Sequence, residues 1–496
     1  MSERCDVVVV GSGAGGGVVA GELAQRDRKV ILLEAGPHLT AADFVRWESK
    51  AAHDFWWPLR MAMVDGGAGG VVPILGGRCV GGTTTMNTKV AFRAHDFEFD
   101  KWHDATGLLG DDGKPFGTET LGPHYERVER VLGVRERADW PECVRTIDAG
   151  FRELGHELEP VDSYTDVNCM KCGSCLQGCP TNAGKSTMNT YIHAATAVGK
   201  LDLRADSPVE RVLFADGDGL EATGVEYRDS EGELHTIEAG AVVVAAGALN
   251  TPQILIRSGL REAAGDSASS RLIGTNLGLH PAAFVFGLFD EVQDAHRVYP
   301  ITSHCMDFMR DEDGGFVLEA STVQDPIGFA TSIADENGPM WGDRLVEAVR
   351  QYRNWNGILV LANDENNGRV VVGEDGSESF EAHFDQVELD RMEAGLEMGR
   401  KVMKAAGAKR VAWTGPASTH VQGTCPMGSD LERSVVDANC ESHDAKRLFV
   451  GDTSLYPKTL SVNPSMTVMA LADRLAQHLD DDPNQYLSAR EAAITA

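Results

Sequence analysis

The stretch "VVVVGSGAGGGVVAGELAQRDRKVILLEAG", residues 7 to 36, decides the fold of this chain. It begins with four valines, a β-branched run that is typical of a buried parallel strand. Gly11, Gly13 and Gly16 follow with G-x-G-x-x-G spacing and open an apolar helix. A second apolar run ends at Glu34, so the stretch predicts a strand–helix–strand unit that binds a dinucleotide.

The glycines and the acid of this unit each have a physical role. The first glycine makes the tight turn, the second lets the backbone approach the diphosphate, and the third lets the helix pack closely. Free N–H groups at the start of the helix, from Ala14 onward, favour the anionic diphosphate. Glu34 is expected to accept the ribose hydroxyls and to repel a 2′-phosphate. The unit does not distinguish FAD from NAD.

Two later segments favour FAD. Residues 76–92, "GGRCVGGTTTMNTKVAF", form a second glycine-rich loop with a run of hydroxyls. Residues 241–259, "AVVVAAGALNTPQILIRSG", predict a strand, a turn and a helix with Thr251 as N-cap and Pro252 as first residue. Three short strands are predicted before this segment, at residues 209–214, 222–228 and 233–238.

Composition and charge narrow the function classes. The chain has 496 residues, of which 42% are hydrophobic and 24% charged, as expected of a globular protein with two or more domains. A formal charge of −30 argues against nucleic acid or an anionic membrane as a partner. No segment approaches the ~20 apolar residues of a membrane span. The first strand leaves no room for a signal peptide before it, so we expect a cytoplasmic protein.

At several places the sequence resembles the glucose-methanol-choline (GMC) family of FAD-dependent alcohol oxidoreductases. "GGRCVGGTTTMN" is similar to the first signature of that family, and "GALNTPQILIRSGL" to the second, although Arg261 replaces a usual glycine. The segments "HVQGTCPMG", "LFVGDTSLYP" and "NPSMTVMALADRLA" are similar to the C-terminal part that lies beside the flavin in the family. The resemblance covers nearly all of the chain.

The resemblance implies an α/β fold with two domains. A Rossmann-type FAD-binding domain would be discontinuous, with residues 1–165, 190–285 and 415–496. Residues 286–414 would form a second, α+β substrate-binding domain built on a mostly antiparallel sheet. Residues 166–189 would form a loop of clustered cysteines between these parts.

The resemblance also implies the site residues. His420 matches the catalytic histidine of the family and would take the hydroxyl proton, since the pKa of imidazole lies near ambient pH. Asn463 matches the second catalytic position, and we expect it to cap a helix that starts at Pro464 and points its positive end at the flavin. Met86 stands where some members bind FAD covalently, so we expect dissociable FAD. His280 is expected to be structural. The residues expected to hold the cofactor are Gly11, Gly13, Ala14, Gly16, Glu34, Gly81, Gly82, Thr83, Asn87, Val209, Gly247, Asp452, Asn463 and Pro464.

The stretch "CMKCGSCLQGCP", residues 169–180, is unusual beside a dinucleotide motif. Cys169, Cys172, Cys175 and Cys179 have the C-x2-C-x2-C-x3-C-P spacing of bacterial ferredoxins, which favours an iron–sulfur cluster, [4Fe–4S] or [3Fe–4S]. A structural zinc and a purely structural role of reduced or disulfide-linked cysteines remain open. Cysteine-rich segments also occur in related long-chain alcohol oxidases, where no cluster is implied, so the resemblance does not decide the matter.

Together these features predict oxidation of an alcohol to the carbonyl by hydride transfer to FAD. A cluster near the flavin would split the electron pair and pass it to an external acceptor, a protein or a quinone. Without a cluster, the alternative is an oxidase that reduces dioxygen to peroxide. A third hypothesis, from a different class, is a lyase of the same fold that keeps FAD without redox turnover.

Overall fold

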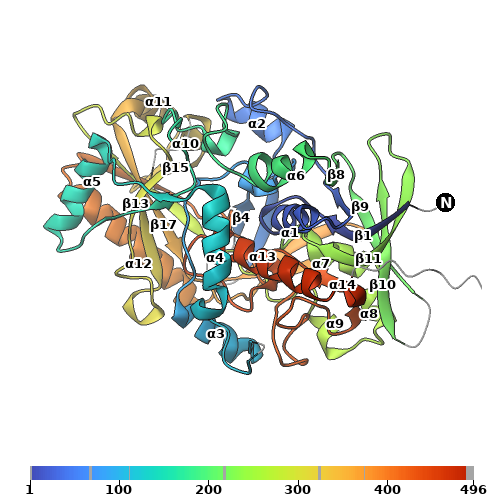
Figure 1. The fold of residues 1–496 in the computed structure, drawn as a ribbon. Coiled ribbons are helices and arrows are strands. Elements are labelled where there is room, and N and C mark those ends of the chain that lie inside the picture. The colour runs from blue at the N-terminus through green and yellow to red at the C-terminus, as the bar shows by residue number, and fades with distance from the viewer. Residues whose placement is uncertain are drawn as a thin grey trace, which may run out of the picture.

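The computed structural model describes residues 3–65, 70–110, 112–215, 219–321, 326–373 and 375–486. Two large sheets stand at opposite ends of the molecule, and helix α4 (Thr118–Leu132) runs between them (Figure 1). Within these ranges no helix has both the length and the apolar character that crossing a bilayer requires.

The first sheet has a parallel centre, as the opening stretch of sequence predicts. Its parallel strands are β8 (Leu201–Arg204), β2 (Val30–Leu33), β1 (Glu3–Val10), β11 (Leu234–Val244) and β22 (Leu448–Val450). The antiparallel strands β10 (Leu220–Arg228) and β9 (Val209–Phe214) extend it beside β11, and the short β21 (Ala445–Lys446) pairs with β10. Val7, Val8 and Val9 have no exposed surface, as is typical of the buried centre of a parallel sheet.

Two helices pack side by side on this sheet, α1 (Ala14–Gln25) and α13 (Ser465–Asp481). A Cβ on Gly16 would lie 2.0 Å from the carbonyl oxygen of Gly11, so glycine alone lets α1 approach the strand this closely. The fully buried Asp473 of α13 pairs with His124 and Arg127 of α4. These ion pairs hold α4 against α13.

The second sheet is antiparallel in every strand pair. Its order is β16 (Gly338–Pro339), β15 (Ile333–Asp335), β20 (Arg410–Thr414), β12 (Ala282–Leu288), β17 (Trp355–Ala362), β14 (Phe316–Ser321), β13 (Ile301–Cys305) and β6 (Glu159–Pro160). Helix α12 (Gln386–Ala405) covers one face, and α5 (Glu142–Glu153) packs against α12. The predicted fold class, a Rossmann-type domain with a second domain on a mostly antiparallel sheet, is confirmed. The domain boundaries stay a prediction.

Smaller elements complete the fold. A four-stranded sheet joins β18 (Arg369–Val372), β19 (Glu378–His383), β3 (Arg60–Asp65) and β4 (Gly70–Ile74), and β5 (Arg135–Glu136) pairs with β7 (Asp162–Ser163). The remaining α-helices are α2 (Glu48–Asp54), α3 (Asp96–Thr106), α6 (His193–Ala197), α7 (Asn250–Arg257), α8 (Leu260–Ala263), α9 (Ala268–Leu272), α10 (Pro326–Ser332), α11 (Asp343–Arg350) and α14 (Pro483–Tyr486).

Two predicted helix starts are wrong. Helix α7 has Leu249 as its N-cap, because the hydroxyl of Thr251 instead donates to the distant carboxylate of Asp452. Helix α13 has Pro464 as its N-cap, and the side-chain oxygen of Asn463 accepts no hydrogen bond from any residue that the structure describes. A tertiary contact therefore overrides the local capping preference of Thr251. Asn463 does not cap α13, so its side chain is available for another role.

Candidate active site

The two glycine-rich loops meet at the start of α1. Gly13 is the N-cap of α1 and offers no side-chain cap to its free N–H groups. A Cβ on Gly13 would meet nothing within 4 Å, whereas a Cβ on Gly82 would lie 2.9 Å from Cα of Gly13. Gly82 has a φ of 50° and Gly81 a φ of 91°, a backbone that favours glycine. The open space beside an uncapped helix start fits a dinucleotide diphosphate.

Glu34 braces this loop from inside the protein. Its carboxylate accepts hydrogen bonds from the backbone and hydroxyl of Ser12, at 3.0 and 2.6 Å, and from the backbone of Gly36 at 2.9 Å. The Ser12 hydroxyl in turn accepts from the backbone N–H of Gly81. Burial raises the pKa of Glu34, and these donors oppose the rise. Ser12, which the sequence analysis missed, thus links both loops, while the ribose contact of Glu34 stays a prediction.

Asp452 joins β22 to the turn before α7. One of its oxygens accepts from the backbone of Gly247 at 2.9 Å and from the hydroxyl of Thr251, and the other accepts from Ser454. Gly247 has a φ of 88° and open space where a Cβ would point. The carboxylate therefore fixes a second glycine turn next to the first sheet.

Three other predicted cofactor residues, Ala14, Thr83 and Asn87, belong to these loops or to the start of α1, whereas Val209 lies on a strand. Ala14 is the first residue of α1, and Val209 begins β9. The Thr83 hydroxyl accepts from the backbone of Gly77 at 3.1 Å. The Asn87 amide donates to the hydroxyl of Tyr164 at 2.8 Å. Direct contacts of these residues with FAD stay predictions.

A pair of histidines forms the centre of the candidate catalytic site. Nδ1 of His420 lies 3.2 Å from Nδ1 of His280, and their ring centroids are 5.2 Å apart. His280 is fully buried, and its Nε2 has no hydrogen-bond partner among the described residues. Burial lowers the pKa of His420 to about 4 and the pKa of His280 well below its usual value. Both imidazoles are therefore neutral near pH 7.

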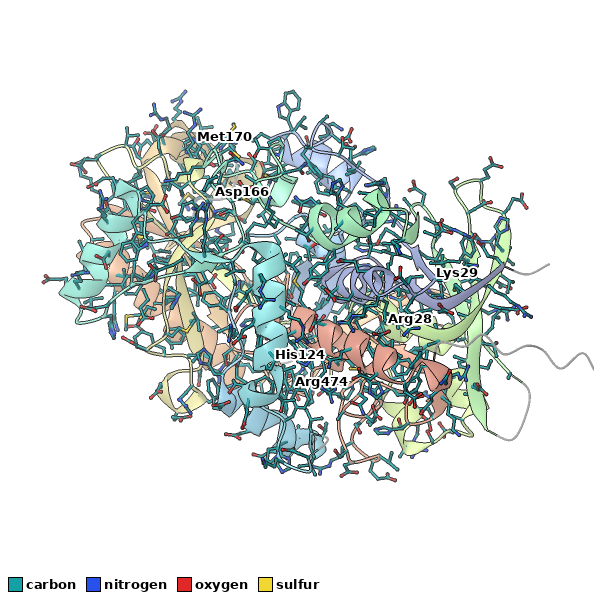
Figure 2. All side chains as sticks on the ribbon, in the orientation of Figure 1. Arg28, Lys29, His124, Asp166, Met170 and Arg474 are labelled. Carbon is teal, nitrogen blue, oxygen red and sulfur yellow. The ribbon has the colours of Figure 1, made fainter. Side chains whose placement is uncertain are left out.

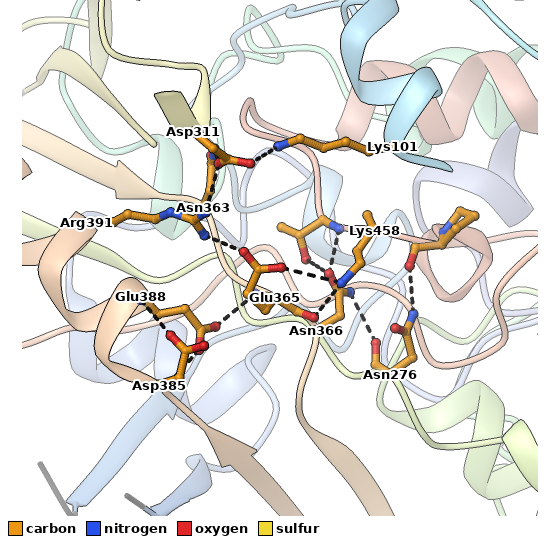
Figure 3. Close-up of polar contacts among 12 residues, drawn as sticks. Lys101, Asn276, Asp311, Asn363, Glu365, Asn366, Asp385, Glu388, Arg391 and Lys458 are labelled. Carbon is orange, nitrogen blue, oxygen red and sulfur yellow. Dashed lines mark hydrogen bonds and ion pairs between the residues drawn. The ribbon is translucent and has the colours of Figure 1, made fainter. Parts of the chain in front are cut away.

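The segments that carry these groups are held by a polar network (Figure 3). Asn366 accepts from the backbone of Thr459 at 2.8 Å, and Lys458 donates to the carbonyl of Glu365 at 2.8 Å. Asn276 donates to the carbonyls of Gly423 and Pro457. The network joins the loop leading to His280, the loop after His420 and the loop before Asn463. It positions all three candidate catalytic residues from three distant parts of the chain.

The four clustered cysteines line one pocket, together with Thr165, Tyr299 and Gly184. All four thiols are free, and the cavity measures about 10 Å³, room for about one water. In the described part of the chain, the only group of three or more His, Cys, Asp or Glu ligand atoms within 4.8 Å of one another is His156, Cys305 and Asp307. Tetrahedral zinc would need sulfurs about 3.8 Å apart. The pocket is thus neither a formed zinc site nor open enough for a cluster as it stands.

Lys89 connects this pocket to the second glycine-rich loop. Its buried ammonium donates to the carbonyls of Thr84 and Thr85 and lies near Cys175 and Cys179. Burial lowers the pKa of Lys89 to about 8, and the two thiols oppose this shift. Asp166 and Met170, labelled in Figure 2, mark the start of the cysteine segment at the upper edge of the molecule.

Comparisons with known proteins agree with this arrangement. Residues 6–282 and 366–472 match the N-terminal and C-terminal models described as GMC oxidoreductase. A long-chain-alcohol oxidase of Arabidopsis thaliana is 26% identical and aligns over 95% of this chain and 67% of its own. An uncharacterized GMC-type oxidoreductase of Mycobacterium tuberculosis is 30% identical over 95% of this chain and 75% of its own. The crystal structure of pyridoxine 4-oxidase from Mesorbium loti superimposes with a TM-score of 0.74 at 20% identity, covering 96% of this chain and 99% of that one.

Proposed function

The chain belongs to the GMC oxidoreductase family, and from this premise we propose that His420 is the base that starts the oxidation of an alcohol. Membership makes it an FAD-dependent oxidoreductase acting on CH–OH donors. The observation that carries the proposal is the contact between His420 and His280.

The contact allows two pairs of tautomers, and the proposed base requires the one in which Nδ1 of His420 carries the proton. A neutral imidazole has one N–H donor and one acceptor nitrogen. If Nδ1 of His420 donates to Nδ1 of His280, Nε2 of His420 is left with a free lone pair. The lowered pKa keeps this nitrogen unprotonated at neutral pH, so it can take the hydroxyl proton of the substrate.

The remaining groups bind and orient. The amide oxygen of Asn463 has no partner among the described residues, and its amide group, which also reaches Glu319, is suited to hold the substrate oxygen. The uncapped start of α1 and the glycine turns at Gly82 and Gly247 form the cradle for FAD. When bound, FAD supplies the acceptor for the hydride that leaves the carbinol carbon.

For the acceptor of the electrons we propose dioxygen, because the first named relatives are oxidases. Iron–sulfur electron transfer has no support in these comparisons. Two structural observations accompany the cysteine spacing. Cys169, Cys172, Cys175 and Cys179 line one pocket, and Lys89 lies between this pocket and the second glycine-rich loop. A cluster would require the cysteine segment to move apart, so it is the second candidate.

The test is to mix the purified flavoprotein with primary alcohols without air and follow bleaching of the flavin absorbance. Admitting air afterwards should restore the oxidised spectrum and release one peroxide for each alcohol oxidised. Flavin that stays oxidised with every alcohol contradicts the proposal and favours a lyase. Reoxidation by a quinone or a one-electron acceptor, but not by air, contradicts the oxidase assignment.

A further inference from the structure

The second sheet directs one buried carboxyl group, that of Glu319, toward the first domain. Side chains alternate between the two faces of a strand. On β14, Phe316, Leu318 and Ala320 pack in the core on the α12 side, while Val317 packs in the core of the nucleotide-binding domain. Glu319 lies two residues beyond Val317 and therefore shares its face.

Two further polar side chains accompany Glu319. His304 is its direct cross-strand partner on β13, and such pairs lie on one face of the sheet. The ring of His304 meets Phe92, the last residue of the second glycine-rich loop, at a centroid distance of 5.2 Å. The amide of Asn463 is close enough to Glu319 to affect its ionisation. The three side chains thus gather on the face of the second sheet that is turned toward the first domain.

This group is incomplete in the protein alone. Apart from the Asn463 amide, which reaches Glu319, the carboxyl oxygens of Glu319 have no hydrogen-bond partner among the described residues. Nδ1 of His304 and the amide oxygen of Asn463 also lack one there. Glu319 is fully buried, and the other two are at most 8% exposed. Leaving a buried polar atom unpaired costs free energy unless another molecule supplies the partner. Buried polar atoms of this kind are completed by an ordered water or by a ligand.

The charge of the group selects the kind of ligand. Burial raises the pKa of Glu319 to about 8, and burial lowers the pKa of His304 to about 4, so both are neutral near pH 7. A protonated carboxyl has one O–H donor and a carbonyl acceptor, and a neutral imidazole likewise has one of each. Their complement is a neutral group that both donates and accepts, which is a hydroxyl.

We propose that Glu319 and His304 bind a second hydroxyl group of the substrate, so that the enzyme acts on polyhydroxy alcohols. The proposal rests on the function proposed above, since it places this hydroxyl beside the carbinol held near Asn463. A long-chain monohydroxy alcohol, the substrate class in the names of two relatives, would leave the carboxyl unpaired.

The test compares α,ω-diols and glycerol with primary n-alcohols of equal chain length. Three forms are used: the wild type, Glu319→Gln and Glu319→Leu. Glutamine keeps a donor and an acceptor, whereas leucine has a similar volume and neither. One measurement is kcat/KM for anaerobic flavin reduction. The other is the rise in Tm of the FAD-loaded protein with added alcohol, which reports binding whether or not the alcohol reacts.

We expect the wild type to prefer diols over n-alcohols by about tenfold or more in kcat/KM, as for sites that read a hydroxyl. Glu319→Gln should keep most of this preference, and Glu319→Leu should lose or reverse it. Diols should raise the Tm of the wild type but not of Glu319→Leu. Equal use of both alcohol classes, an unchanged preference in Glu319→Leu, or stronger binding of amino alcohols than of diols overturns the proposal. Diol binding without flavin reduction would support the hydroxyl site while contradicting the oxidation itself.

Discussion

His420 and His280 face each other through their Nδ1 atoms at 3.2 Å, although 140 residues separate them in the chain. Only one of the two nitrogens can carry the shared proton in a pair of neutral rings. The arrangement therefore couples their tautomers, and His280 is a positioning residue for the proposed base. This coupling makes His280 a more informative target than a buried histidine usually is.

Two substitutions of His280 should show whether its hydrogen-bond acceptor or only its volume matters for catalysis. His280→Asn places a carbonyl oxygen near the position of Nδ1, and asparagine tolerates the positive φ of 44° at this residue. His280→Leu removes the acceptor. We expect the leucine variant to lower the rate of flavin reduction about tenfold or more and the asparagine variant to recover most of it. Equal rates in both variants, with FAD bound in each, would mean that His280 only fills space.

The proposed base should impose a pH dependence on the reaction. The protonated imidazole cannot accept a proton, and burial sets the pKa of His420 at about 4. We therefore expect kcat/KM for flavin reduction to rise from acidic pH, level off above about pH 5, and change again near pH 8, where Glu319 ionises. His420→Ala should lower the rate about 10²–10⁴-fold and abolish the acidic limb, with the flavin spectrum retained. If His420→Ala keeps both the rate of flavin reduction and the fall of kcat/KM at acidic pH, His420 is not the base.

Substitution by alanine should affect two glycines of the first loop differently: at Gly13 it should lower the affinity for FAD, and at Gly16 it should lower the stability of the fold. Gly13→Ala puts a methyl group into open space at a φ of −64°, so the protein without FAD should keep its stability while FAD affinity falls about tenfold or more. Gly16→Ala puts a methyl group 2.0 Å from the carbonyl oxygen of Gly11 and should destabilise the fold by about 1–3 kcal/mol. Thermal unfolding of the apoprotein and FAD titration give the two quantities. Unchanged FAD affinity in Gly13→Ala would place the diphosphate elsewhere.

The sequence predicts the regular parts of this fold well, because their signals are local. The valine run, the glycine spacing and the strand at residues 209–214 are all found where the periodicity puts them. The helix starts at Thr251 and Asn463 are predicted wrongly, because Asp452 takes the Thr251 hydroxyl from a distant strand. Asp452 is among the predicted cofactor residues, but no local sequence pattern indicates that it binds Gly247 and Thr251.

The chemistry of the site is only partly visible in the sequence. His420 and Asn463 follow from motif position. His280 was expected to be structural, since nothing near it in the sequence points to His420. Glu319 had no signal except that a charged residue interrupts an apolar strand, "FVLEAS", and this interruption is a clue that could have been used.

The cysteine pocket offers the last prediction, and it decides between the two proposed acceptors. Burial beside the other cysteines raises the pKa of Cys175, so this thiol stays protonated without a metal. At Cys179 burial also raises the pKa, but the backbone N–H of Gly184 and the hydroxyl of Thr181 outweigh it and lower the value. Metal binding would displace the thiol protons, so what disfavours a metal is the narrow cavity of about 10 Å³ that the cysteines line. We therefore expect protein purified without air to contain FAD but no stoichiometric iron, sulfide or zinc, and Cys172→Ser to keep both FAD and peroxide formation. Iron and sulfide that accompany the flavin and are lost in Cys172→Ser would reverse this assignment and establish the cluster.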